Sequence, residues 1–169
     1  MDKHIIRTAV PADQDVLTEL KTAYIRGLFR GFLPAEHLKG LDPTPYRSEL
    51  GECLANPALQ ILICMEEDTP QGYLTIGTDP EDPSCGMIFD AAANLDADPA
   101  VRDTLIVTAA ERLAARGNSR IHIWLLRDNF RVRFLFEQFN FKAEGTLRPY
   151  QVEGREVQLI RYVYRIPTL

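Results

Sequence analysis

A helix-length segment between two apolar, strand-length segments constrains the fold of this chain most strongly. Residues 87–92 and 121–126 are short and apolar, and residues 99–116 between them place apolar side chains at helical spacing. Asp98 and Pro99 are residue types that favour the start of a helix. A strand, a helix and a second strand in this order form a right-handed crossover between parallel strands. The sequence therefore predicts that residues 87–92 lie beside residues 121–126 and run parallel to them.

The segments on either side of this unit also alternate between strand and helix patterns. Before it, the expected elements are a strand at 5–9, a helix beginning at Pro11, helices at 34–38 and 46–56, strands at 59–65 and 73–78 joined by a turn at 69–72, and a polar loop at 79–84. After it, they are a helix from Asp128 or Asn129 to about Phe139, a left-handed Asn140, and strands at 141–152 and 156–166 joined by a tight turn at Glu153 and Gly154. Strands and helices in this order predict an α/β fold.

Length and composition place the chain among ordinary globular proteins. Its 169 residues have the length of one domain, so we expect a single domain over residues 1–169. The 46% hydrophobic and 25% charged residues exclude a disordered or fibrous chain. No stretch approaches the ~20 apolar residues of a membrane span, and residues 1–20 show no signal-peptide pattern. We therefore expect a cytoplasmic protein that does not bind a membrane.

Charge and cysteine content argue against two further classes of protein. The 24 acidic and 19 basic residues give a net charge of −5, whereas a general nucleic-acid-binding protein is basic. The 3 cysteines are an odd number without metal-ligand spacing, and the 3 histidines also lack such spacing. We expect reduced thiols, no metal site and no nucleic-acid partner.

Several landmarks, in their order along the chain, resemble those of the GNAT acyltransferases. Residues 6–13 are similar to the family's first strand and helix entry, and residues 33–38 to its acceptor-side loop. The strongest stretch is 109–141, in which Asn129 begins a helix that ends Phe-Asn-Phe. There the family has Asn, then Ala, then Phe-Tyr, and finally Gly-Phe. The terminal hairpin at 145–165 completes a resemblance that covers nearly the whole chain.

The resemblance implies a GNAT-like α/β fold with a mixed, mostly antiparallel central sheet, a splayed parallel strand pair and flanking helices. It implies transfer of an acetyl or other acyl group from acyl-coenzyme A to an amine of a small molecule or peptide. Acetyl-coenzyme A would be the co-substrate, bound by backbone groups of the splayed strands and by amides at a helix N-terminus. The resemblance implies no metal ion, and it leaves a homodimer as an open alternative.

The resemblance also assigns the coenzyme A site residue by residue. The site is expected at the end of the strand at 87–92, at the start of the helix at 99–116, and on the helix that begins at Asn129. The expected cofactor-binding residues are Ala91, Ala92, Ala100, Val101, Arg102, Asn129, Val132 and Phe136.

This sequence departs from the family at the pyrophosphate motif, Arg/Gln-x-x-Gly-x-Gly/Ala. Asp98 would lie near a bound anion, and Pro99 has no N–H to donate. The amides of Ala100 and Val101 are expected to be free, and Arg102 is expected to compensate in part. Alternatively, Asp98 and Pro99 serve only as a helix cap.

Two further departures lie on the helix that begins at Asn129. Val132 replaces a small alanine, and Phe136 stands where the family often has a tyrosine that protonates the departing thiolate. A phenyl ring cannot donate a proton, so water would have to protonate the thiolate. Alternatively, Asn129 is only a helix cap, and the helix carries four core aromatics: Phe130, Phe134, Phe136 and Phe139.

The expected catalytic residues are Asp90 and Tyr150. Asp90 is the only acid on its strand, where the family often has a glutamate base, and strand alternation places it on the face of Ile88. Tyr150 would line the acceptor site, unless it is an ordinary strand tyrosine. His122 shares a strand face with Trp124 and is either a base or a packed, hydrogen-bonded histidine.

Two classes of function follow from these patterns. The first is acyl-coenzyme A-dependent N-acyl transfer. The second is a catalytically degraded relative that serves as a ligand-binding or interaction module. The altered pyrophosphate motif favours the second class, and the complete order of elements favours the first.

Overall fold

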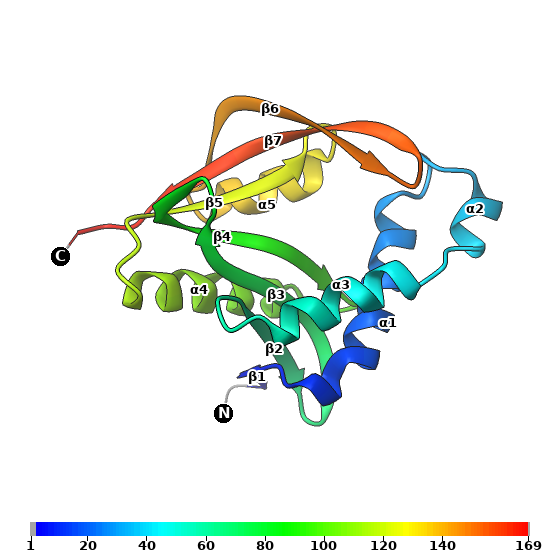
Figure 1. The fold of residues 1–169 in the computed structure, drawn as a ribbon, viewed down its shortest axis with the longest axis horizontal. Coiled ribbons are helices and arrows are strands. Elements are labelled where there is room, and N and C mark those ends of the chain that lie inside the picture. Colours follow the sequence, from blue (N-terminus) through cyan, green and yellow to red (C-terminus); the bar gives the residue numbers. More distant parts are fainter. Residues whose placement is uncertain (1–2, 169) are drawn as a thin grey trace. The chain divides into compact units, whose positions relative to one another are not determined.

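The computed structural model describes residues 3–168 (Figure 1). Its strands are β1 (His4–Thr8), β2 (Gln60–Glu66), β3 (Thr69–Asp79), β4 (Asp82–Ala93), β5 (Arg120–Leu126), β6 (Lys142–Val152) and β7 (Arg155–Arg165). Its helices are a 3-10 helix (Pro11–Asp13), α1 (Gln14–Leu28), α2 (Ala35–Lys39), α3 (Thr44–Ala55), α4 (Pro99–Ala115) and α5 (Phe130–Gln138).

The strands form one sheet in the order β1-β2-β3-β4-β5-β7-β6. β4 and β5 pair in parallel from Cys85↔Arg120 to Ile88↔Ile123, and α4 connects them along the chain. The pairs β1–β2, β2–β3, β5–β7 and β6–β7 are antiparallel. The predicted α/β fold, with a parallel strand pair joined through a helix, is confirmed.

The chain divides into two compact units. The first consists of Met1–Ile76 and Asp90–Ala109, and the second of Gly77–Phe89 and Ala110–Leu169. β3, β4 and α4 each begin in one unit and end in the other.

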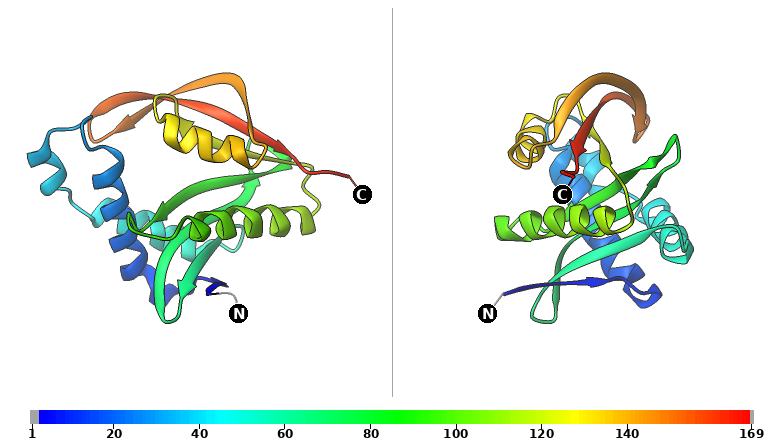
Figure 2. Two further views of the ribbon diagram at one scale, coloured as in Figure 1. Left: turned by 180° about the vertical axis from the view of Figure 1, so that it is seen from behind. Right: turned by 90° about the vertical axis from the view of Figure 1, so that its left-hand side faces the viewer.

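In the first unit, α1 and α3 pack against each other and against β2 and β3 (Figures 1 and 2). The buried side chains of this core are Leu17, Leu20, Leu50, Ile61, Ile63, Tyr73 and Ala92. Asp13 fixes the start of α1, because its carboxylate accepts hydrogen bonds from two nitrogens of Arg7, each at 2.8 Å, and from the Val10 N–H at 2.8 Å. An ion pair therefore connects β1 to the first helix.

In the second unit, α5 lies across one face of the β5–β7–β6 ladder (Figure 2). Arg133 of α5 donates a hydrogen bond to the hydroxyl of Tyr162, 2.8 Å away, and Tyr162 pairs with Ile123 of β5. Phe136 of α5 packs edge-on against Phe141, with ring centroids 5.2 Å apart. Side chains alternate along a strand, so the even-numbered residues of β5 lie on the opposite face from α5.

The sequence placed two turns incorrectly. The β2–β3 hairpin turns at Glu67 and Asp68, with Glu67 at φ 53, and not at residues 69–72. The two acidic side chains favour the solvated tip, and Pro70 is tolerated in β3 beside an irregularity in the β2–β3 register. The expected polar loop at 79–84 is also shorter, because β3 continues to Asp79 and β4 starts at Asp82.

Other local predictions hold. Asn140 adopts φ 65 behind α5, and Glu153 and Gly154 adopt φ 48 and φ 77 between β6 and β7. Asn and Gly tolerate this left-handed conformation better than other residues. Asn140 can therefore end α5, and Gly154 can complete the turn between β6 and β7.

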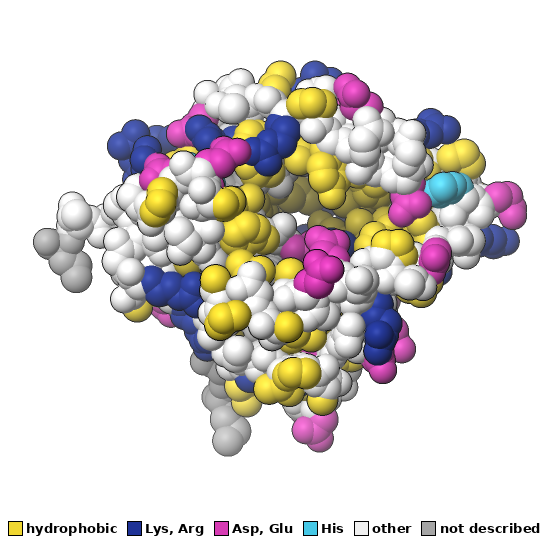
Figure 3. Space-filling model, viewed as in Figure 1, with side chains coloured by type: hydrophobic (Ala, Val, Ile, Leu, Met, Phe, Trp, Pro, Cys, Tyr) yellow, Lys and Arg dark blue, Asp and Glu magenta, His cyan; other side chains and the backbone are white. Residues whose placement is uncertain are grey.

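Basic and acidic side chains are interspersed over the face seen in Figure 3. This distribution accords with the near balance of 24 acids and 19 bases. Among residues 3–168, no helix is both long and apolar enough to cross a membrane.

Candidate functional site

Asp90, the expected general base, lies in the first unit near the end of β4. Its Oδ1 accepts hydrogen bonds from the Lys21 ammonium of α1 and from the Ala91 N–H, the latter at 3.0 Å. Its Oδ2 accepts a hydrogen bond from the Tyr73 hydroxyl at 2.8 Å. The side chains of Lys21 and Asp90 are only 14% and 17% exposed, so the ion pair is largely removed from water. An amine proton would therefore compete with three donors that already hydrogen-bond this carboxylate.

Two tyrosines, Tyr73 of β3 and Tyr24 of α1, feel the charge of this carboxylate. Burial raises the pKa of Tyr73 well above 10, and the charge of Asp90 and its hydrogen bond to the hydroxyl raise it further. Burial also raises the pKa of Tyr24, again with a contribution from Asp90, while Arg102 lowers it. Tyr73 therefore stays protonated and acts as a permanent hydrogen-bond donor to Asp90.

The backbone of β4 beyond Asp90 was expected to bind the pantetheine arm. The Ala91 N–H is used by Asp90, and the Ala92 side chain is buried in the core of the first unit. A Cβ placed on Gly72 of β3 would lie 2.9 Å from the Ala92 carbonyl oxygen, so β3 approaches β4 closely here.

The start of α4 carries the expected pyrophosphate site. The Ala100 N–H donates to Asp98 Oδ1 at 2.9 Å, and the Val101 N–H donates to the Asp98 carbonyl oxygen at 2.9 Å. The expectation that these two amides are free is wrong, because Asp98 caps the helix through both its side chain and its backbone. Arg102 is exposed and remains available to an anion. Asp98 therefore acts as the helix cap that the sequence indicated.

In the second unit, Asn129 caps α5. Its side-chain oxygen accepts a hydrogen bond from the Val132 N–H at 3.2 Å, so Asn129 acts as a helix cap. Val132 is half-buried, and Phe136 is 4% exposed against Phe141.

The expectation that the phenylalanines of α5 are all core residues is wrong for two of them. Phe130 and Phe134 are 69% and 62% exposed. They are four residues apart and share one helix face, and α5 directs Phe136 rather than that face into the core. The Arg133 guanidinium lies over the Phe130 ring, 5.4 Å from its centroid.

Tyr150, the second expected catalytic residue, is 52% exposed on β6 and pairs with Val157 of β7. It lies two residues from Arg148, on the same face of β6.

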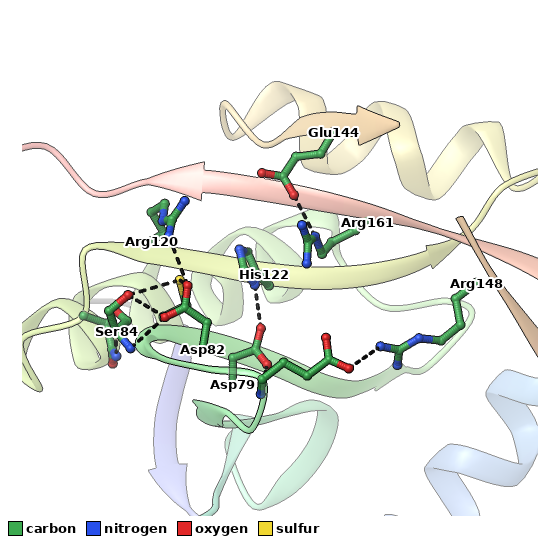
Figure 4. Close-up of polar contacts among 11 residues, drawn as sticks. Asp79, Asp82, Ser84, Arg120, His122, Glu144, Arg148 and Arg161 are labelled. Carbon is green, nitrogen blue, oxygen red and sulfur yellow. Dashed lines mark hydrogen bonds and ion pairs between the residues drawn. The ribbon is translucent and has the colours of Figure 1, made fainter. Parts of the chain in front are cut away.

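Sequence reasoning missed a buried, hydrogen-bonded pair, Asp79 and His122, on the face of β5 that lies opposite α5 (Figure 4). His122 Nδ1 and Asp79 Oδ2 are 2.6 Å apart, and the two residues are 3% and 4% exposed. Asp79 Oδ1 also accepts the Glu81 N–H at 2.8 Å. The sequence showed His122 beside Trp124 but assigned Asp79 to a loop, so its partner could not be identified.

The same face holds the single tryptophan between two arginines. The Arg148 and Arg161 guanidinium carbons lie 4.2 and 5.8 Å from the Trp124 ring centroid. Arg148 donates to Glu81 at 3.2 Å, and Arg161 donates to Glu144 at 2.7 Å. Arg148 of β6 thus reaches over β7 to Trp124 of β5 and to the turn between β3 and β4.

The expected site residues fall into two groups, one in each compact unit. Those of the first unit are Asp90, Ala91, Ala92, Ala100, Val101 and Arg102. Those of the second unit are Asn129, Val132, Phe136 and Tyr150. Within the part of the chain that the structure describes, no cluster of three or more His, Cys, Asp or Glu side chains could hold a metal ion.

The sequence matches no family model and no curated protein. Solved structures match over nearly the full chain at low identity. The GCN5-related N-acetyltransferase from Rhodopseudomonas palustris has a TM-score of 0.77 at 16% identity, covering 98% of this chain and 98% of that one. The PaiA N-acetyltransferase from Thermoplasma acidophilum, solved with coenzyme A, has a TM-score of 0.75 at 17% identity, covering 98% and 100%.

A third structure, yncA from Salmonella typhimurium with its cofactor acetyl-coenzyme A, has a TM-score of 0.67 at 14% identity, covering 97% of this chain and 94% of that one. The resemblance first read from the sequence thus extends to the whole arrangement of strands and helices. The chain has the fold of the GNAT N-acetyltransferases.

Proposed function

We propose that this protein transfers an acyl group from acyl-coenzyme A to an amine of a small molecule or peptide. The observation that carries the proposal is the match, over 98% of the chain, to an N-acetyltransferase that was solved with coenzyme A. A second structure with this fold holds acetyl-coenzyme A. At these identities the likeness concerns the fold, so the chemistry must be argued from the chain's own residues.

In the first unit, Ala91 and Ala92 would bind the pantetheine arm of coenzyme A, and the start of α4 would bind its pyrophosphate. The positive end of the helix dipole and the exposed Arg102 suit an anion there. Asp98 opposes this role, because its carboxylate occupies the Ala100 amide. Rotation of Asp98 away from that amide would remove a cap that typically contributes ~1 kcal/mol.

In the second unit, the proposal places the acyl-bearing end of the co-substrate beside α5, at Asn129, Val132 and Phe136. Phe136 has no proton to give, so the departing thiolate takes its proton from water or from the attacking amine. Orientation of the amine against the thioester then supplies most of the rate enhancement. Tyr150, exposed on β6, would contact the acceptor.

One observation favours the second candidate, a binding module without catalysis. Pro99 offers no N–H, and the next two amides, those of Ala100 and Val101, both donate to Asp98. A pyrophosphate would therefore meet a carboxylate instead of the free donors that usually bind it at a helix N-terminus.

Release of free thiol from acetyl-coenzyme A, in the presence and absence of primary amines, tests the proposal. An acyltransferase releases thiol in proportion to the acetylated amine found by mass spectrometry. The Asp98→Asn variant tests the effect of the carboxylate charge, since Asn caps a helix as well as Asp but carries no charge. We expect it to lower the KM for acetyl-coenzyme A about 2- to 5-fold, the effect of one charge at a helix N-terminus. Binding of acetyl-coenzyme A without thiol release from any amine would support the second candidate and overturn the first.

A further inference from the structure

The buried pair Asp79–His122 defines the state of one histidine ring. Both oxygens of Asp79 are accounted for, because Oδ1 accepts the Glu81 N–H at 2.8 Å and Oδ2 lies 2.6 Å from His122 Nδ1. A carboxylate only accepts, so Nδ1 carries the hydrogen and donates it to Asp79. In a neutral ring, this leaves Nε2 with a lone pair that can accept a proton.

Nε2 of His122 has no hydrogen-bond partner among the described residues, although it is buried. Buried polar atoms almost always have a partner, and exceptions call for an explanation such as an ordered water or a catalytic role. His122 lies on an inner strand, paired with Met87 of β4 and Val163 of β7, and its hydrogen bond to Asp79 orients the ring. The geometry is thus that of an oriented imidazole with one unused nitrogen.

The surroundings of His122 are polar on one side. Figure 4 shows the ring between Asp79 and Arg161. The charged groups near this face of β5 are Asp79 of β3, Glu81 of the following turn, Asp82 of β4, Arg120 of β5, Glu144 and Arg148 of β6, and Arg161 of β7. Most of these groups are partly exposed, so water can reach the rim of this face, whereas Nε2 itself is buried beneath it.

We propose that His122, oriented by Asp79, is the proton acceptor for the acyl transfer proposed above, on which this inference rests. It fits the role better than Asp90. Both oxygens of Asp90 are already hydrogen-bonded to Lys21, Tyr73 and the backbone, whereas Nε2 of His122 is free of partners among the described residues. Asp79 is a positioning residue, because it acts only through His122.

The ammonium group of the acceptor passes one proton, through a water molecule, to His122 Nε2. The nitrogen lone pair attacks the thioester carbonyl carbon, a C–N bond forms, and the C–S bond breaks with its electron pair leaving on sulfur. The thiolate takes the second proton lost by the nitrogen, and His122 later returns its proton to solvent.

The first arm of the test needs no variant and no turnover. Nitrogen-15 NMR of the histidine rings in the wild-type protein reports which ring nitrogen carries the hydrogen. We expect the Nδ1–H form for His122 at neutral pH. The Nε2–H form would overturn the proposal.

The second arm measures acetyl transfer against pH for His122→Gln, Asp79→Asn and Asp90→Asn. We expect His122→Gln to lower kcat/KM about 10²- to 10⁴-fold, to abolish the fall in rate at acid pH, and to leave the KM for acetyl-coenzyme A unchanged. Asp79→Asn should also lower the rate, because an amide can hold the ring in the other tautomer. His4→Gln is the matched control, since His4 Nε2 is likewise buried without a hydrogen-bond partner but lies beside Glu66 in the first unit.

The outcomes separate this inference from the function on which it rests. A wild-type enzyme that is active, together with a His122→Gln variant of unchanged rate and pH profile, overturns the role of His122 alone. Loss of activity in Asp90→Asn with none in His122→Gln gives the role to Asp90. A wild-type protein that transfers no acyl group overturns the proposed function and this role with it.

Discussion

Replacing Lys21 by methionine should destabilise the first unit, because it leaves the carboxylate of Asp90 largely buried without its cation. Two unit charges 4 Å apart attract by about 4 kcal/mol at an effective dielectric of 20. Removing one partner of a fully buried pair costs ~3–5 kcal/mol. The side chains of this pair are 14% and 17% exposed, which reduces the expected loss to roughly 2–4 kcal/mol for Lys21→Met.

Asp90→Asn should cost a similar amount, since it leaves the ammonium of Lys21 unpaired. The double variant removes both charges and keeps an amide that can accept from Tyr73. Its loss should therefore be smaller than the sum of the single losses by about 1–3 kcal/mol. Urea unfolding followed by circular dichroism gives all three free energies.

The matched control is Arg47→Met, which removes an ion pair with Asp15 whose side chains are 54% and 81% exposed. It should change the free energy of unfolding by no more than about 1 kcal/mol. Additive losses for Lys21→Met and Asp90→Asn, within about 0.5 kcal/mol, would refute the argument that the two charges stabilise each other.

Three further predictions follow from single contacts. The hydrogen bonds from Arg7 keep the pKa of Asp13 below its usual value, so the stability that they contribute is present above about pH 4 and is lost as the pH falls through the folded-state pKa. Asp13→Asn should flatten the fall of the urea midpoint in this acid range, and an unchanged pH dependence would contradict the assignment. Gly72→Ala should cost ~1–3 kcal/mol, seen as a lower thermal midpoint, because its Cβ would lie 2.9 Å from the Ala92 carbonyl oxygen. Phe136→Ala should cost ~3–5 kcal/mol of unfolding free energy, because the ring is 4% exposed, and Phe136→Tyr should preserve or raise the rate of thiol release.

The strand–helix–strand unit could be predicted because its signals are local. Asp98 and Pro99 mark the start of α4, and the apolar spacing behind them has the helical period. Parallel pairing of the flanking strands follows from chirality rather than from any distant contact. The position of the β2–β3 turn was predicted wrongly because it does not depend on local signals alone. Pro70 and Gly72 are local turn signals, but the register of β3 against β2 decides where the chain reverses.

The candidate site was less predictable because its contacts join distant parts of the sequence. Lys21 and Asp90 are 69 positions apart, and Asp79 and His122 are 43 positions apart. No spacing rule connects residues on separate elements, so the sequence could name Asp90 and His122 but neither of their partners. The start of α4 was also predicted only in part. The sequence identified Asp98 both as a helix cap and as an obstacle to an anion. It did not show that the Asp98 carboxylate accepts the Ala100 N–H, which was expected to be free for an anion.

Calorimetric titration of the wild-type protein with acetyl-coenzyme A tests the central claim most directly. It measures whether this chain, with Asp98 capping α4, still binds the co-substrate of the proposed reaction. Micromolar affinity, together with weaker or equal affinity for free coenzyme A, is the result that acyl transfer predicts. The absence of binding heat with millimolar acetyl-coenzyme A would contradict the proposed acyl transfer. The chain would then have the GNAT fold without binding the acyl donor.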